Sequence, residues 1–112
     1  MNNQQLMDAA FARIRPRFLA ALSLRFDEML PLRQAAEVPK THVDALNAIK
    51  SGAHKTVGSA ETLGFVQLGR TSSQAEVAIY KYISTGGQEP ALRDMFAQVD
   101  RMLAEMRAAL GK

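Results

Sequence analysis

The sequence predicts an all-α protein, namely an antiparallel up-and-down four-helix bundle with a short N-terminal helical extension. Three observations support this fold class. Apolar residues recur at spacings of three and four along nearly the whole chain, which is the period of a helix packed on one face. Strand-like alternation between turns is absent. The breaks in the helical pattern are short, and helices with short connections pack as antiparallel neighbours.

The N-terminal extension covers about residues 1–15 and carries Leu6, Ala10 and Ile14 on one stripe. Pro16 follows it directly. A proline is accepted in the first turn of a helix, whereas inside a helix it produces a kink. Pro16 therefore either begins a new helix or kinks a continuous one, and the sequence leaves both options open.

The four-helix bundle covers about residues 16–110. Its first helix has apolar residues at helical spacing: Phe18, Leu22, Phe26, Met29 and Leu30. We expect a kink at Pro31. The helix should end by Glu37, because the segment Val38-Pro39-Lys40 that follows is typical of a connection.

The second bundle helix is predicted to begin at Thr41, whose hydroxyl is suited to accept a hydrogen bond from a first-turn amide. Asp44 lies three residues later, in the place of the glutamate of a capping box. The predicted inner stripe of this helix consists of Val43, Leu46, Ala53, Val57 and Ala60.

The third bundle helix is predicted to begin near Leu63-Gly64. Its inner stripe consists of Phe65, Leu68, Ala75, Ile79 and Tyr82. The turn residues 84–87 end it. Pro90 is well placed to begin the last helix. That helix has the clearest stripe: Leu92, Met95, Phe96, Val99, Met102, Leu103, Met106 and Leu110.

Length and composition indicate a single domain with its own core, since the chain has 112 residues, of which 47% are hydrophobic and 22% charged. It has no cysteine, which excludes disulfides and thiolate metal sites. An apolar run of the ~20 residues that a membrane span needs is absent. The N-terminal residues lack the pattern of a signal peptide. We therefore expect a soluble, cytoplasmic monomer.

His54 is the candidate for chemistry. It lies one step around the helix from the inner Ala53, and Gly58, one turn later, leaves the imidazole uncrowded. An imidazole with one nitrogen held by a hydrogen bond is a nucleophile at the other, so it could accept a phosphoryl group. Lys50 and Lys55 could offset the negative charge. The alternative is an ordinary surface histidine beside a glycine that permits close helix packing.

Other kinds of chemistry have less support. His42 and His54 are the only histidines, and on one helix they are too far apart to bind the same metal, so we expect no metal site. We expect His42 to be a solvated first-turn residue. His54 and Ser59 point in different directions on one helix, which does not suit a hydrolase. Phosphate-binding glycine motifs are absent.

The segment from residue 53 to residue 64 resembles the string A-H-x-L-K-G-S-A-x-x-L-G of histidine-containing phosphotransfer (HPt) domains in bacterial two-component phosphorelays. The matching residues are Ala53, His54, Gly58, Ser59, Ala60, Leu63 and Gly64. Phe26 and Pro31 are similar to a common Phe–Pro pair in the preceding helix. Thr56 and Val57 stand where the family usually has leucine and lysine, and Thr62 stands where asparagine is frequent.

This resemblance implies that His54 takes a phosphoryl group from the aspartate of one receiver domain, in a hybrid histidine kinase, and passes it to another, in a response regulator. It implies no kinase activity and no cofactor on this chain, since the Mg²⁺ belongs to the receiver domain. The binding surface for the phosphoryl group and the partner is expected to include Lys50, Lys55, Gly58, Gln67 and Arg70.

Two other functions stay open. One is a degenerate HPt-like interaction module that binds a kinase or receiver without phosphotransfer, and Val57 in place of the usual lysine favours it. The other is a small basic nucleic-acid-binding protein. The net charge of +3 and the pI of about 9.6 favour it, whereas the scattered basic residues and the lack of a binding motif count against it.

Overall fold

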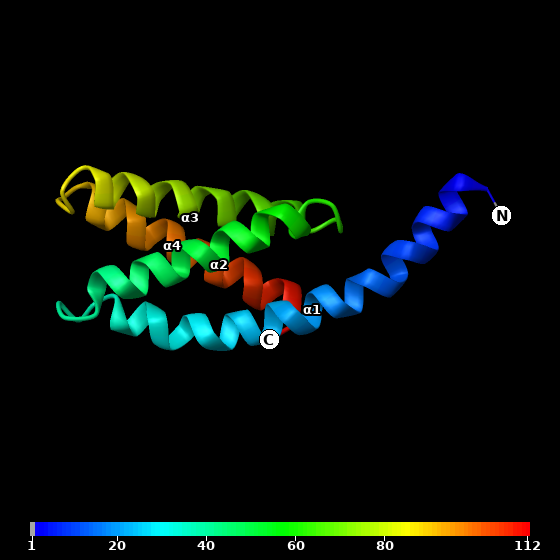
Figure 1. Cartoon of the computed structure of the whole chain (residues 1–112), viewed down its shortest axis with the longest axis horizontal. Coiled ribbons are helices and arrows are strands. Elements are labelled where there is room, and N and C mark those ends of the chain that lie inside the picture. Colours follow the sequence, from blue (N-terminus) through cyan, green and yellow to red (C-terminus); the bar gives the residue numbers. More distant parts are fainter. Residues whose placement is uncertain (1) are drawn as a thin grey trace.

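The computed structural model describes residues 2–112 and has four α-helices packed as an antiparallel bundle (Figure 1). The helices are α1 (Asn3–Ala35), α2 (His42–Ala60), α3 (Val66–Ser84) and α4 (Ala91–Leu110). The predicted all-α bundle is therefore confirmed. None of the helices formed by residues 2–112 combines the length and the hydrophobicity that a membrane span requires.

Helix α1 is continuous through Pro16 and Pro31, so the N-terminal extension is not a separate helix. A capping box fixes its start. The Asn2 side chain accepts a hydrogen bond from the Gln5 amide over 2.8 Å, and the Gln5 side chain accepts one from the Asn2 amide over 2.9 Å. Figure 1 shows the N-terminal part of α1 bending away from the bundle. The missing amide and the ring of Pro16 account for a change of direction in this part of the helix.

The core lies between the inner faces of the four helices. Its largest fully buried apolar side chains are Leu22, Met29, Leu46, Ile49, Leu68, Ile79, Met95, Val99, Met102 and Met106. The stripe predicted for the last helix is confirmed, because each member is buried or packs against the buried cluster. In α1, however, Leu6, Ile14 and Leu30 are exposed. The extension therefore contributes little to the core.

The inner stripe predicted for α2 is partly wrong. Val43 is exposed and Val57 is only partly buried, whereas Thr56 is fully buried. The Thr56 hydroxyl donates to the Gly52 carbonyl over 2.8 Å and accepts from Arg25 Nη1 over 2.9 Å. These two bonds offset the cost of burying a hydroxyl. A prediction from hydropathy alone therefore places the valines of this helix on its inner face and misses the buried threonine.

The capping box predicted at the start of α2 is also wrong. Thr41 occupies the N-cap position, but its side chain caps no amide of this helix. Its hydroxyl instead donates to the carbonyl of Ala35, the last residue of α1, over 2.7 Å. The threonine thus closes the turn between α1 and α2.

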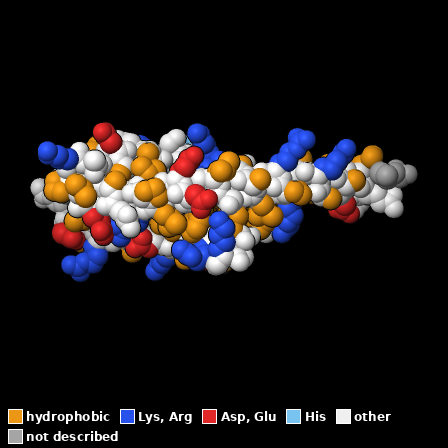
Figure 2. Space-filling model, turned by 90° about the horizontal axis from the view of Figure 1, so that it is seen from below, with side chains coloured by type: hydrophobic (Ala, Val, Ile, Leu, Met, Phe, Trp, Pro, Cys, Tyr) orange, Lys and Arg blue, Asp and Glu red, His pale blue; other side chains and the backbone are white. Residues whose placement is uncertain are grey.

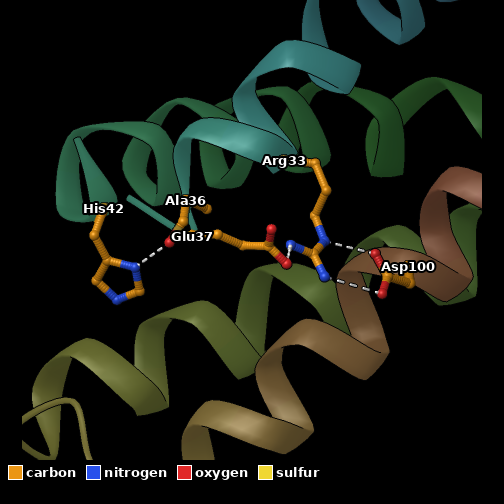
Figure 3. A network of polar contacts seen from close by, with 5 residues as sticks. All are labelled: Arg33, Ala36, Glu37, His42 and Asp100. Carbon is orange, nitrogen blue, oxygen red and sulfur yellow. Dashed lines mark hydrogen bonds and ion pairs between the residues drawn. The ribbon is translucent and has the colours of Figure 1, made fainter. Parts of the chain in front are cut away.

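An arginine joins the first helix to the last at this end of the bundle (Figure 3). Arg33 Nε and Nη2 donate to the two carboxylate oxygens of Asp100 over 2.7 and 3.3 Å, and Nη1 donates to Glu37 over 3.2 Å. The guanidinium also lies 4.2 Å from the centre of the Phe96 ring. The hydrogen bond to Asp100 raises the pKa of Arg33 above its ordinary value.

His42 is not the solvated residue expected from the sequence. It is partly buried, and its Nδ1 donates to the Ala36 carbonyl (Figure 3). Because a carbonyl only accepts, Nδ1 carries the ring proton in the neutral form, and Nε2 accepts from the Tyr82 hydroxyl over 2.6 Å. The Tyr82 ring also packs edge-on against the imidazole. His42 thus connects the α1–α2 turn to α3.

Candidate functional site

His54 lies on the outer surface of α2, with 75% of its side chain exposed. Its Nδ1 lies 2.7 Å from Oε2 of Glu76, a residue of α3. The Glu76 side chain is 30% exposed, so the pair sits at the seam between the two helices, with the carboxylate on the inner side. Of the residues highlighted from the sequence, His54 is found where its helical position predicts it.

The packing of α2 against α3 brings Glu76 to His54. Near the turn between the helices, Gly69 lies so close to Glu61 that an added Cβ would overlap the glutamate side chain. His54 is one heptad earlier on α2 and Glu76 one heptad later on α3, so in an antiparallel pair they meet along the same seam. Gly69 therefore permits the close approach of the two helices that carry this pair.

The contact with Glu76 determines which ring nitrogen of His54 is available. A carboxylate accepts hydrogen bonds, so Nδ1 carries the proton and donates it to Glu76. The lone pair then belongs to Nε2, for which residues 2–112 provide no hydrogen-bond donor. An exposed imidazole with Nδ1–H held and Nε2 free is a nucleophile ready to react at Nε2.

The glycines of α2 serve different purposes. A Cβ at Gly52 would overlap Cε of the buried Met29, so this glycine leaves room for the end of that α1 side chain. A Cβ at Gly58 would meet nothing within 4 Å, apart from its own helix. Close packing thus explains Gly52 and does not explain Gly58. Gly58 instead leaves a helix position without a side chain one turn from His54. This is expected if the glycine serves to leave the imidazole uncrowded.

A hollow of about 400 Å³ opens beside Gly58, between the N-terminal half of α1 and the end of α2. Its lining is mainly apolar and includes Phe11, Ile14, Phe18 and Leu63. Arg25 lies at its edge. Burial lowers the pKa of the Arg25 guanidinium, because desolvation disfavours its charged form. The surface beside Gly58, one turn from His54, is thus an apolar depression whose lining also includes the cations Arg17 and Arg25.

The other predicted residues lie at different distances from His54. Lys50 is one turn earlier on α2 and partly buried, and Lys55 is exposed beside a second hollow, toward α1. Gln67 lines a hollow between α3 and α4 with Glu105, so the structure does not bring it to His54. Arg70 is exposed on α3, six residues or about 9 Å along the axis from Glu76.

Sequence reasoning missed Glu76, which reaches His54 from α3, and Arg25, which reaches Thr56 and the hollow beside Gly58 from α1. Among residues 2–112, no cluster of three histidine, aspartate or glutamate side chains suited to a metal ion is found. Comparison with protein families shows that residues 14–109 match the Hpt domain. No curated protein and no solved structure matches the chain.

Proposed function

Because the chain belongs to the Hpt domain family, whose domains transfer phosphoryl groups on histidine in phosphorelays, we propose that His54 is the residue that carries the phosphoryl group. We propose the aspartates of two receiver domains as its donor and acceptor, one in a hybrid histidine kinase and one in a response regulator. The observation that carries this proposal is the His54–Glu76 contact, which holds Nδ1–H and leaves Nε2 exposed.

The transfer needs few groups on this chain. The Nε2 lone pair attacks the phosphorus of the aspartyl phosphate in line, and the bond from phosphorus to the aspartate oxygen breaks as the carboxylate leaves. The imidazole becomes cationic, and the Glu76 carboxylate stabilises that charge through Nδ1–H. The second transfer reverses these steps on another receiver domain. The Mg²⁺ that would neutralise the phosphoryl oxygens would be held by the receiver domain and not by this chain.

The partner surface is proposed to surround His54. Gly58 offers bare backbone, and the apolar hollow beside it can receive side chains of a docked receiver domain. Lys50 and Lys55 flank the histidine on α2 and can attract the acidic phosphorylated partner. Arg70 is a more distant member of this surface. Gln67, which lies toward α4, is not included.

The test is phosphorylation of the purified chain by phosphoramidate and by a phosphorylated receiver domain, followed by intact mass and ³¹P NMR. We expect an acid-labile addition of ~80 Da on the parent and on His42→Gln, and none on His54→Gln. His42→Gln is the matched control because these are the only two histidines. Gly58→Gln should accept phosphate from phosphoramidate normally but slowly from the receiver domain, since its side chain obstructs only a large donor.

The second candidate function is an interaction module without phosphotransfer. The observation that favours it is Val57, which occupies the position of the family's usual lysine and is partly buried, so it offers no cation to a phosphoryl group. A parent chain that binds a receiver domain but stays unmodified, beside an active Hpt domain in the same tube, would establish this alternative. Restoring the lysine with Val57→Lys should then recover phosphoryl acceptance.

A further inference from the structure

Tyr80 is an exposed aromatic residue of α3, one turn beyond Glu76. It is 63% exposed, whereas the other tyrosine of the chain, Tyr82, is buried. The Ser84 hydroxyl donates to the Tyr80 backbone carbonyl, but within the described part of the chain the Tyr80 hydroxyl has no hydrogen-bond partner. This phenol is therefore free to donate to a group that arrives from outside the bundle.

The antiparallel alignment of α2 with α3 relates this tyrosine to His54 (Figure 1). Glu61 lies against Gly69, and His54 contacts Glu76. On each helix these two contacts are one heptad apart, so the alignment is regular over two turns. The next turn of α3 carries Tyr80, which therefore continues the series of α3 residues along the seam.

Tyr80 and Glu76 share the side of α3 that faces this seam. They are four residues apart and differ by only about 40° around the helix. On α2, Lys50 precedes His54 by the same interval, so the alignment sets Lys50 opposite Tyr80. Lys50 is partly buried and Tyr80 is exposed, which places the lysine in the seam and the tyrosine on its outer rim.

The directions of the two side chains bring Tyr80 and His54 toward each other. A side chain on a helix is inclined toward the N-terminus and covers the turn that precedes its own Cα. His54 is thus inclined toward the level of Lys50, and Tyr80 toward the level of Glu76. Because the helices are antiparallel, these inclinations are opposite, and together they span the difference of about 6 Å between the two levels.

The other side of His54 offers no such donor along the seam. Val57 is partly buried, and Gly58 has no side chain. Charge is also not concentrated on the face of the bundle seen in Figure 2, where acidic and basic side chains are interspersed. A phosphoryl group on Nε2 therefore depends on groups close to it, and along the seam these are Lys50 and Tyr80.

On the basis of the phosphoryl transfer proposed above, we propose that the Tyr80 hydroxyl donates a hydrogen bond to the phosphoryl group that His54 carries. Lys50 offsets the charge of the same group from α2. The phenol keeps its proton, and no bond of Tyr80 is formed or broken, so the hydroxyl acts only by favouring the anionic phosphoryl oxygens. A neutral donor on α3 thus takes the place of the lysine that the family usually has at the position of Val57.

The first test is the last ionisation of the phosphoryl group, measured from the pH dependence of the ³¹P shift after the full chain is modified by phosphoramidate. A hydrogen bond donated to the dianion lowers the pKa of the phosphoryl group, so Tyr80→Phe should raise that pKa by about 0.5. Thr71→Val is the matched control. It also removes one hydroxyl from α3, one that donates to the Gln67 carbonyl over 2.9 Å, and it should leave the phosphoryl pKa unchanged.

The second test is the rate of phosphoryl transfer from a phosphorylated receiver domain. Tyr80→Phe should slow this transfer roughly 3- to 10-fold, because one hydrogen bond to the phosphoryl group is lost. Urea denaturation should show unchanged stability, since the lost hydroxyl bonds to nothing in the bundle. Tyr80→Ala that slows the transfer while Tyr80→Phe does not would mean that the ring contacts the receiver domain, and would overturn the proposal.

The parent chain separates failure of this proposal from failure of the proposed function. A parent that neither phosphoramidate nor the receiver domain modifies would show that the proposed function is wrong, and the role of Tyr80 would be refuted with it. A modified parent whose phosphoryl pKa and transfer rate match those of Tyr80→Phe would overturn only the role of Tyr80. Thr71→Val that raises the phosphoryl pKa as much as Tyr80→Phe would overturn it as well.

Discussion

At the scale of single residues, Glu76 decides what His54 can do. It lies 2.7 Å from Nδ1 and sits on α3, so it fixes both the ring orientation and the tautomer from a second helix. A histidine held in this way presents Nε2 in one direction, and reactions that need in-line attack are sensitive to such orientation. In the proposed phosphohistidine, the proton on Nδ1 is also the one through which the carboxylate would stabilise the cation.

Two substitutions of Glu76 should distinguish its role in orienting the His54 ring from its role in stabilising the cationic phosphohistidine. Glu76→Gln keeps an oxygen that accepts from Nδ1–H, so phosphoryl acceptance should persist with a less stable phosphohistidine. Glu76→Ala removes the acceptor, and the rate of acceptance should fall roughly 10- to 100-fold. The measurements are the rate of modification by phosphoramidate and the half-life of the modified protein. Equal rates for the alanine and glutamine variants would show that Glu76 does not orient the ring.

At the scale of helices, α1 and α2 are joined by a polar contact within an apolar interface. Arg25 Nη1 donates to the hydroxyl of the buried Thr56, which donates in turn to the Gly52 carbonyl. Gly52 lies opposite Met29, whose Cε would overlap a Cβ at this position. The hydrogen bonds and the close contact therefore fix the same region of the α1–α2 interface.

Thr56→Val should destabilise the bundle, because it removes the acceptor of Arg25 and leaves a methyl group in its place. Thr71→Val is the matched control, since Thr71 also donates to a carbonyl one turn earlier, over 2.9 Å, but accepts no bond from another helix. We expect the free energy of unfolding to fall by about 1 kcal/mol more in Thr56→Val than in Thr71→Val. Urea denaturation measures both, and equal losses would mean that the Arg25 contact contributes nothing.

The helices themselves could be predicted from the sequence because their apolar periodicity is local. Where each helix ends, and what its terminal residues contact, could not be predicted. Pro16 and Pro31 carry ordinary helix-breaking chemistry, yet α1 continues through both. Thr41 has the chemistry of a cap, yet its hydroxyl bonds to α1. In each case the outcome depends on packing against other helices, which a single sequence does not specify.

In the candidate site, too, only the residues that share one helix could be related to each other from the sequence. His54 and Gly58 lie on one helix, so helical spacing alone relates them. Glu76 becomes a neighbour of His54 only through the antiparallel alignment of α2 with α3, and Arg25 reaches Thr56 only through the packing of α1 against α2. Two glycines of similar sequence context, Gly52 and Gly58, could be distinguished only by what surrounds them in space.

At the scale of the whole molecule, the two ends of the bundle differ. One end is closed by polar contacts: Arg33 joins α1 to α4 (Figure 3), and His42 joins the α1–α2 turn to Tyr82 of α3. At the other end α1 leaves the bundle, and the apolar hollow beside Gly58 lies open. The contacts of His42 and the accessible surface beside Gly58 are thus segregated along the long axis.

This segregation predicts that the two histidines have independent roles. His42→Ala removes two hydrogen bonds, leaves the buried Tyr82 hydroxyl without its partner and should lower the free energy of unfolding by about 2 kcal/mol. His54→Ala removes a mostly exposed side chain and should change that free energy by less than about 0.5 kcal/mol. Phosphoryl acceptance should be lost only in the second variant.

The double variant tests the independence directly. The two positions are twelve residues apart on α2, or about 18 Å along the helix axis, so their effects on stability should add to within about 0.5 kcal/mol. The parent, the two single variants and the double variant form a double-mutant cycle. Urea denaturation of all four gives the coupling free energy between the two positions. A larger coupling, or slow phosphorylation of a folded His42→Ala protein, would show that the closed end controls the accessible histidine and that α2 transmits the effect along its length.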